Sequence, residues 1–295
     1  MCAGEDGDVC GQLEDFLNAE DDPPQEEYDG AGRRLFNRNE RLLIFTHCQG
    51  KCFFCYRPLD FSEGWFAVHL DPTRSEDYTV VTNGVASCRE CTGRKAELTH
   101  RQFVEQFGGK SGVPTGIRCH GFTHNLVRCE AVVVGVGLFC SGEHHQLYQY
   151  VRDNTREDSA EVEEVDGEGR RIFNKNERML IHLHCKGECF YCGKRFRLEE
   201  PWEADHLIPW SKEGRTTVVN GVLACRNCNR KKSNMTHHEF VKKCGGQNGI
   251  YEEIHCHGYE TVELRCFNFT TGTRHYCEDT DGECQKVRRK VMRSL

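Results

Sequence analysis

Apolar positions in the second half of the chain first follow a helical spacing. In NERMLIHLH, residues 176–184, the side chains of Met179, Leu180 and Leu183 fall on one face of a helix. Gly187 follows and is a residue type that ends helices. The pattern therefore predicts a short amphipathic helix directly before the first cysteine pair of this half.

The spacing then changes to that of strands. EADHLIPW (203–210) predicts a short strand, TTVVNGVLAC (216–225) a strand with a turn, and RNCNRKKSN (226–234) the start of a helix. Thr236 and Glu239 form a capping-box pair for one more helix, which a Gly-Gly pair ends. The expected order is helix, cysteine pair, ββα unit, helix and a cysteine-rich tail.

The same pattern occurs twice. RRLFNRNERLLIFTHCQGKCFFCYRPL begins at Arg33, and RRIFNKNERMLIHLHCKGECFYCGKRF begins 137 residues later at Arg170. The same offset relates further residues of the two copies, including Cys52 and Cys189, Trp65 and Trp202, and His69 and His206, which indicates a tandem duplication. The expected organisation is an acidic tail at 1–24, a first repeat at 25–152, an acidic linker at 153–169, and a second repeat at 162–291 with a basic tail to 295.

The net charge of -7 is unevenly distributed. Residues 1–29 hold eleven acidic residues and no Lys or Arg, and 153–169 holds eight acidic residues and one Arg. The remainder of the chain is therefore at about +11. The basic segments RNCNRKK (226–232) and KVRRKVMRSL (286–295) could contact phosphates, which gives affinity without sequence preference.

Twenty cysteines require an explanation that fits the expected location of the chain. The N-terminal segment lacks the features of a signal peptide, and no apolar run approaches the length of a membrane span. We therefore expect a soluble protein with no membrane partner. We also expect a reducing intracellular compartment, the cytoplasm or the nucleus, or else a virus-encoded protein, and not secretion. Cysteines in such a compartment bind zinc more often than they form disulfides.

Each repeat contains a CxxC…CxxC arrangement, the spacing of a closed structural zinc site. The predicted ligands are Cys52, Cys55, Cys88 and Cys91 in the first repeat and Cys189, Cys192, Cys225 and Cys228 in the second.

A second set with longer spacings follows in each repeat, so we expect up to four zinc ions. His120 and His257 are competing candidate ligands for these sites. The predicted sets are Cys119, Cys129, Cys140 with His144 or His145, and Cys256, Cys266, Cys277 and Cys284.

Residues 185–235 resemble the zinc-stapled branch of the HNH (ββα-metal) endonuclease family. The resemblance is carried by the residue types, order and spacing of Cys189-x-x-Cys192, Asp205-His206, Pro209, Asn220, Cys225-x-x-Cys228-Asn229 and Lys232. It implies an α+β fold of small zinc-stabilised domains, with two tandem ββα-metal repeats, each followed by a cysteine-rich zinc module.

Hydrolysis of a phosphodiester bond needs a base for water and a cation for the developing charge. His206 has a suitable pKa range for the base, and Asp205 and Asn229 are oxygen ligands that suit Mg²⁺ or Mn²⁺. The resemblance implies that His206 is the general base, that Asn220 orients its imidazole, and that Asp205 and Asn229 bind the catalytic ion. Arg230, Lys231 and Lys232 are candidate phosphate contacts.

The first repeat lacks both expected ligands of the catalytic ion. Val68 stands where the second repeat has Asp205, and Thr92 stands where it has Asn229, although His69 and Asn83 are retained. Asp71 could form a displaced site, but no residue replaces the amide ligand. We therefore expect an inactive first repeat.

With one active site per chain, we expect nicking of double-stranded DNA. A double-strand break would then need a homodimer or a larger assembly. The alternative is a non-enzymatic zinc-stapled protein, derived from such a nuclease, that binds nucleic acid or serves as a scaffold. Intact Asp205, His206, Asn220 and Asn229 argue against this alternative.

Overall fold

Each half of the fold begins with a helix that has the same N-terminal cap. The computed structural model describes residues 34–62, 64–73, 78–155, 172–197, 200–270, 274–277 and 282–294. The expected acidic tail at 1–24, and the expected linker beyond its first three residues, lie outside the described residues. Helix α2 (Arg38–His47) opens the first half, and α6 (Lys175–His184) opens the second.

The caps explain why both helices begin where they do. Asn37 accepts a hydrogen bond from the backbone of Glu40, whose side chain accepts one from the backbone of Asn37. Asn174 and Glu177 form the same capping box in α6. A cap of this kind stabilises a helix by about 1 kcal/mol. Helix α6 has the extent expected from the apolar spacing of residues 176–184 within one residue.

A ββα unit follows each of these helices. Strand β3 (Glu203–His206) pairs antiparallel with β4 (Gly221–Ala224), so that Asp205 lies opposite Val222. Helix α7 (Arg226–Lys232) continues directly from β4. The first half has the corresponding elements β1 (Trp65–His69), β2 (Gly84–Cys88) and α3 (Arg89–Lys95), with a short 3-10 turn η1 (Val81–Asn83) before β2 and another, η2 (Trp210–Lys212), after β3.

A second helix with a threonine cap completes each ββα module. Thr99 and Gln102 cap the first of these helices. Thr236 and Glu239 cap the second, which is the capping box that the sequence predicts. The remaining elements belong to the cysteine-rich tails. The bounds are α4 (His100–Phe107), α5 (Gly142–Thr155), α8 (His237–Cys244), β5 (Tyr259–Thr261), β6 (Leu264–Arg265) and α9 (Glu283–Ser294).

A buried arginine joins each cysteine-rich tail to its ββα module. Arg265 is fully buried and donates hydrogen bonds to the carbonyl groups of Val218, Val219 and Gly221, the segment that leads into β4. Arg128 makes the equivalent contacts in the first half. A guanidinium has five N–H donors in one plane, so a single arginine side chain can bind several carbonyl groups of one backbone turn and hold that turn in place.

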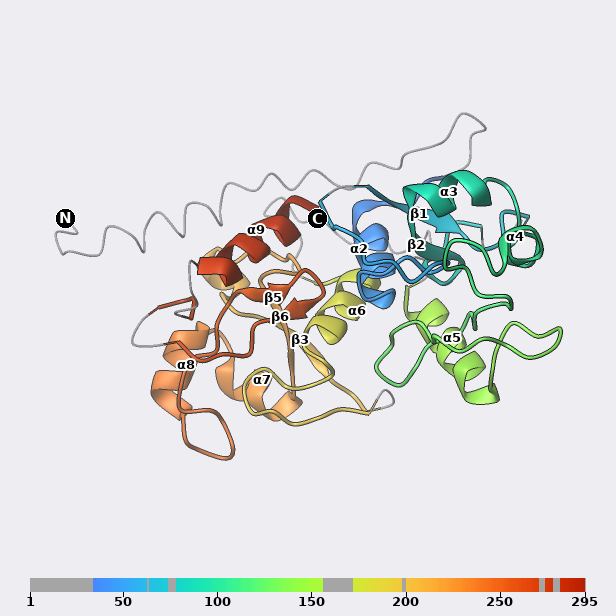
Figure 1. Ribbon diagram of the computed structural model, residues 1–295. Helices are drawn as coiled ribbons and strands as arrows, with labels where there is room; N and C mark the ends of the chain where they lie inside the picture. Colours follow the sequence, from blue (N-terminus) through green and yellow to red (C-terminus); the bar gives the residue numbers. More distant parts are fainter. Residues whose placement is uncertain are drawn as a thin grey trace.

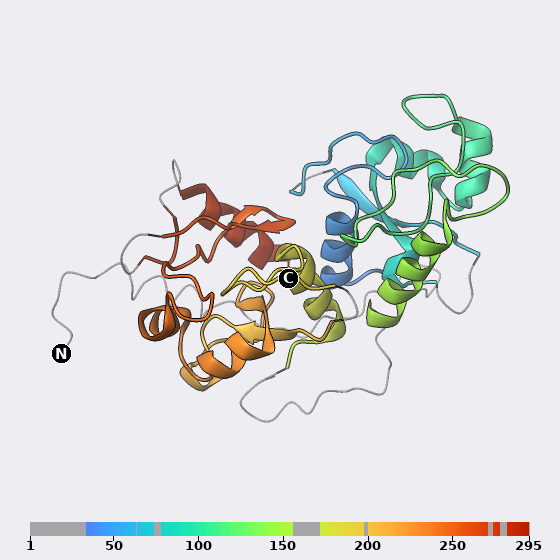
Figure 2. The same cartoon turned by 90° about the horizontal axis from the view of Figure 1, so that it is seen from below.

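The two halves pack against each other through α2 and α6 (Figures 1 and 2). In Figure 1, the first half, drawn blue to green, lies beside the second, drawn yellow to red, and α9 lies over β5. Small two-stranded sheets, short helices and cysteine clusters confirm the expected α+β class with zinc-type modules. None of the described helices has the length and apolar character required to cross a membrane.

Candidate functional site

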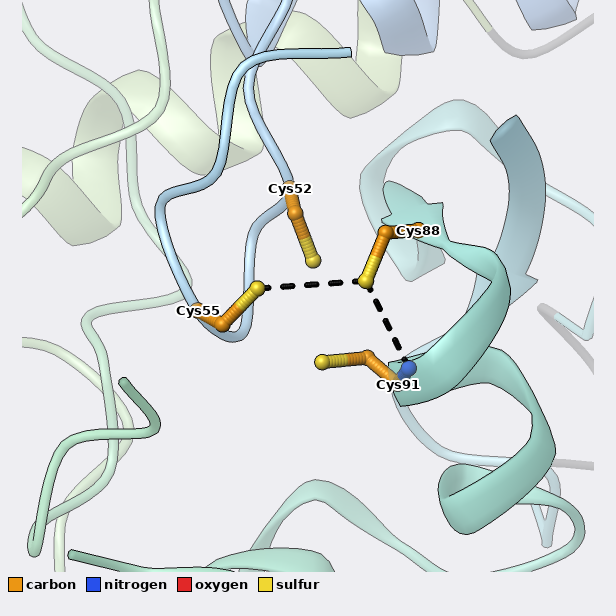
Figure 3. Close-up of side chains that lie close together, drawn as sticks. All are labelled: Cys52, Cys55, Cys88 and Cys91. Atoms are coloured by element: carbon orange, nitrogen blue, oxygen red, sulfur yellow. Dashed lines mark hydrogen bonds between the residues drawn. The ribbon is translucent and has the colours of Figure 1, made fainter. Parts of the chain in front are cut away.

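The first cysteine cluster has the geometry of a zinc site. Figure 3 shows that Cys52 and Cys55, on a tight turn, point toward Cys88 and Cys91 at the start of α3. The Sγ atoms of Cys55 and Cys88 are 3.8 Å apart, and the four sulfurs lie within 4.8 Å of one another. Two sulfurs bound to one tetrahedral zinc are about 3.8 Å apart, because each Zn–S bond is about 2.3 Å.

The second half repeats this cluster. Cys189, Cys192, Cys225 and Cys228 lie together, with 3.9 Å between the sulfurs of Cys192 and Cys225. The N-terminus of α7 donates a backbone hydrogen bond from Cys228 to the Cys225 sulfur at 3.3 Å. Such donors stabilise thiolates. All described cysteines are free thiols, so these four-cysteine groups are compatible with structural zinc.

The cysteine-rich tails contain two further clusters. Cys256, Cys266, Cys277 and Cys284 converge in the second half. In the first half the fourth member is His144, whose Nδ1 lies 3.0 Å from the Cys140 sulfur, whereas His145 packs on Phe139. The structure thus favours His144 over His145. His120 and His257 are outside both clusters.

The second half holds a buried polar group between β3 and α7. Asp205 is 7% exposed; its Oδ2 accepts a 2.6 Å hydrogen bond from Tyr191 and lies 3.1 Å from Lys232 Nζ. Burial raises the pKa of the Asp205 carboxyl, and Lys232 and Tyr191 counter this by favouring the carboxylate. Lys232 also donates to the carbonyl of His206 at 2.6 Å.

Asn229 and Lys232 lie on the same face of α7, one helical turn apart. The Asn229 Nδ2 donates a 2.7 Å hydrogen bond to Glu203, which precedes Asp205 by two residues and therefore shares its face of β3. Glu203 belongs to no motif in the sequence and is identified by this contact. The contact fixes the amide so that its oxygen is the atom left to accept or to bind a cation.

His206 lies at the end of β3 and is half-buried. Its ring packs on Phe173 with 4.5 Å between centroids, and its Nε2 lies 3.0 Å from the Thr216 hydroxyl. Thr216 was also missed by the sequence reasoning. Asn220, expected to orient the imidazole, instead holds the following loop: it bonds both backbone groups of Ile208 and the carbonyl of Arg215.

The three basic residues at the end of α7 differ in exposure. Arg230 is exposed and Lys231 is half-buried, whereas the Lys232 side chain has 0% exposure and contacts Asp205. Lys232 is therefore a partner of the carboxylate and not an outward phosphate contact. Arg230 and Lys231 remain the candidates for that role.

The first half lacks four members of this polar group, not two residues alone, although the buried lysine is retained. Lys95, the counterpart of Lys232, is equally buried, but Val68 stands opposite it and its ammonium donates to the Leu98 carbonyl. Burial lowers the pKa of Lys95 to about 8. The residues at the positions of Tyr191, Glu203, Asp205 and Asn229 are Phe54, Phe66, Val68 and Thr92.

His69, the counterpart of His206, is also half-buried but has an aromatic ring on each side. His69 lies between Phe36 and Tyr78, with ring centroids 4.5 and 4.0 Å away. In the second half Arg215 occupies the position of Tyr78. Asp71, considered for a displaced metal site, accepts hydrogen bonds from the backbone and the hydroxyl of Thr73, and so closes a local turn.

The donor set of the second half fits the expected catalytic ion in chemical type. A carboxylate at Asp205, an amide oxygen at Asn229 and a second carboxylate at Glu203 lie at one strand–helix interface. These are hard oxygen ligands, which Mg²⁺ and Mn²⁺ prefer. The Lys232 ammonium, 3.1 Å from Asp205 Oδ2, offsets part of the negative charge of these carboxylates.

Comparison with known proteins identifies the module that holds this group. Residues 189–235 match the family of HNH endonucleases, which confirms the resemblance carried by the motif. No curated protein matches the chain. A solved structure, that of the Type II-C Cas9 enzyme from Actinomyces naeslundii, is similar at 16% identity over 52% of this chain and 15% of its own, with a TM-score of 0.25.

Proposed function

We propose that the HNH domain at residues 189–235 gives this chain a metal-dependent endonuclease activity, with its single active site in the second repeat. One observation supports this most strongly. The half that matches the HNH family is also the half that keeps Tyr191, Glu203, Asp205 and Asn229 together. A module that serves only to bind structural zinc would not need these four side chains. The first half has the four-cysteine cluster and lacks all four.

His206 is the proposed general base. If its Nε2–H donates to the Thr216 hydroxyl, Nδ1 carries the lone pair that can take a proton from water. Phe173 supports one face of the ring and limits its rotation. Asn220 acts indirectly in this account, because it holds the loop on which Thr216 lies.

Asp205 and Asn229 would hold Mg²⁺ or Mn²⁺, and Glu203 would orient the Asn229 amide. The bound ion would supply positive charge to the phosphate and to the departing oxygen. Lys232 would hold Asp205 in position and keep its carboxylate ionised in a buried setting.

Double-stranded DNA is the proposed substrate. Arg230 and Lys231, at the outer end of α7, would contact the phosphate backbone without reading the bases. One active site cuts one strand per encounter, so the product is a nick unless two chains act together. Four zinc ions in the cysteine clusters would hold the frame, and their reduced thiols suit a reducing compartment.

A second candidate function is that of a non-enzymatic nucleic-acid-binding scaffold. The observation that favours it is the burial of Asp205, whose carboxylate already has Lys232 and Tyr191 as partners. Such a triad also stabilises a fold without any catalysis. The two functions differ in one outcome: a nuclease cuts the nucleic acid when a divalent ion is present, and a scaffold binds it without cutting.

The test is relaxation of supercoiled plasmid by the full-length, zinc-loaded protein with Mg²⁺ or Mn²⁺, beside the same protein without added Mg²⁺ or Mn²⁺, with its zinc content verified in both. The proposal expects metal-dependent nicking. Plasmid that is bound and shifted on a gel, but uncut under every metal condition, would support the scaffold. Matched duplex and single-stranded DNA and RNA of one sequence then define the substrate.

A further inference from the structure

Three histidines outside the HNH site converge in the second half. His238 lies in the first turn of α8, and His257 and His275 lie in the cysteine-rich tail. One ring nitrogen from each falls within 4.8 Å of the others. The Nδ1 atoms of His257 and His275 are 3.3 Å apart.

That separation matches a shared metal ion. Two imidazole nitrogens on one tetrahedral zinc are about 3.3 Å apart, because each Zn–N bond is about 2.05 Å. A direct hydrogen bond between the two rings is the alternative. His238 brings a third ring to the same point, which a single hydrogen bond between the other two does not require.

The surroundings orient these rings as metal ligands. His257 Nε2 lies 3.0 Å from Nδ1 of His237, a buried histidine, so a hydrogen bond there leaves His257 Nδ1 for a ligand. His238 Nε2 lies 3.2 Å from the carbonyl of Arg274, an acceptor that makes Nε2 the protonated nitrogen. Metal-binding histidines commonly donate their other N–H to a neighbouring acceptor in this way.

The first half has only part of this histidine cluster, so the two halves can be compared directly. His100 and His120 keep the same pair, with 2.9 Å between Nδ1 and Nε2, but Arg101 and Leu138 stand at the positions of His238 and His275. The backbone is equivalent, since His120 donates to the Leu138 carbonyl at 2.8 Å and His257 donates to that of His275 at 2.8 Å. The two halves therefore differ in the side chains that could bind an ion, whereas the frame is common to both.

The neighbouring thiolates do not account for the histidines. Cys256, Cys266, Cys277 and Cys284 already supply four sulfur ligands, which complete a tetrahedral site. The geometry points to a fifth metal site, in which His238, His257 and His275 bind one zinc ion. Three imidazoles with a fourth position open suit Zn²⁺, and not the oxygen-seeking Mg²⁺. The ion would tie the N-terminus of α8 to the tail.

The test counts metal on full-length protein whose cysteine clusters are already loaded. Zn²⁺ is titrated calorimetrically, and the ions per chain are then counted by native mass spectrometry. The wild type should take one more Zn²⁺ than His275→Leu and His238→Arg, which carry the first-half residues. His124→Leu, which removes an exposed histidine elsewhere, should bind as the wild type does.

Equal zinc content in the wild type and in folded His238→Arg would overturn the inference, even if His275→Leu fails to fold. The reverse change gives a second arm: Arg101→His with Leu138→His builds the triad around His120. A gain of one Zn²⁺ in that protein would support the site. Neither arm depends on nuclease activity, so the outcome is separate from that of the proposed function.

Discussion

The Tyr191 hydroxyl donates a 2.6 Å hydrogen bond to the buried Asp205 carboxylate. The residues at these two positions in the first half are Phe54 and Val68, so donor and acceptor are absent together. Because a buried carboxylate without donors is costly, the two residues form one unit. The first half therefore lacks the supporting hydroxyl together with the carboxylate that it would support.

Tyr191→Phe should lower the free energy of unfolding by about 1.5–3 kcal/mol, the usual effect of losing a hydrogen bond to a charged group. It should also slow plasmid nicking, since Asp205 loses one of the groups that hold it. Guanidinium denaturation with zinc present measures the first effect. Tyr251→Phe, which removes a half-buried hydroxyl away from Asp205, is the control. Equal stability of both variants would show that the Tyr191 bond contributes nothing.

The two buried lysines provide a matched pair. Lys232→Met leaves Asp205 buried without its counter-charge, and breaking such a pair costs about 3–5 kcal/mol. Lys95→Met should cost only about 0.5–1.5 kcal/mol, because it loses the hydrogen bond to the Leu98 carbonyl but separates no ion pair: Val68 stands where the carboxylate would be. Denaturation midpoints of the two variants test the difference. A similar cost at both positions would contradict the assigned role of Lys232.

Acid should destabilise the fold through buried histidines. Burial lowers the pKa of His47 and His184 to about 3, whereas an unfolded histidine titrates near 6.5. Between these values the unfolded chain binds more protons, so their contribution is full above pH 6.5 and is lost as pH falls toward 3. The denaturation midpoint should therefore drop from pH 7 to pH 5 more in the wild type than in the double variant His47→Gln, His184→Gln. Zinc release affects both proteins, and a parallel drop in the two would refute the histidine contribution.

Cysteines inside and outside the clusters should differ in their effect on metal content. Cys225→Ser should lose one zinc per chain and much of its thermal stability, because the metal links β4 and α7 to the first cysteine pair. Cys185→Ser should retain every zinc, since that buried sulfur accepts a backbone hydrogen bond from Leu223 and belongs to no cluster. Native mass spectrometry counts the ions. Loss of zinc from the Cys185 variant would contradict the ligand assignment.

Local patterns were sufficient to predict the ββα modules. Apolar spacing, capping residues and glycines lie within the segments they specify, so the helix at 176–184 and the capping box at Thr236 could be read directly. Helix α9 was not anticipated, because it lies in a strongly basic segment. Its burial of Val291 and Arg288 depends on contact with the tail, which no local pattern reveals.

The site was predicted only in part, for a related reason. Glu203, Tyr191 and Thr216 act through side-chain contacts across elements, and the family motif does not mark them. Aligning the two repeats could have identified Glu203 and Tyr191, because the first half has phenylalanine at both of these positions. The choice between His144 and His145 depended on the rotation of α5, which adjacent identical residues cannot indicate.

The most direct test of the active second repeat compares two equivalent histidines. His206→Ala and His69→Ala are assayed for Mg²⁺-dependent or Mn²⁺-dependent relaxation of supercoiled plasmid, each with its zinc content verified. We predict that nicking is lost in His206→Ala and retained in His69→Ala, with nicked circles accumulating before any linear product. Retained nicking in His206→Ala, or loss of nicking in His69→Ala alone, would contradict this prediction.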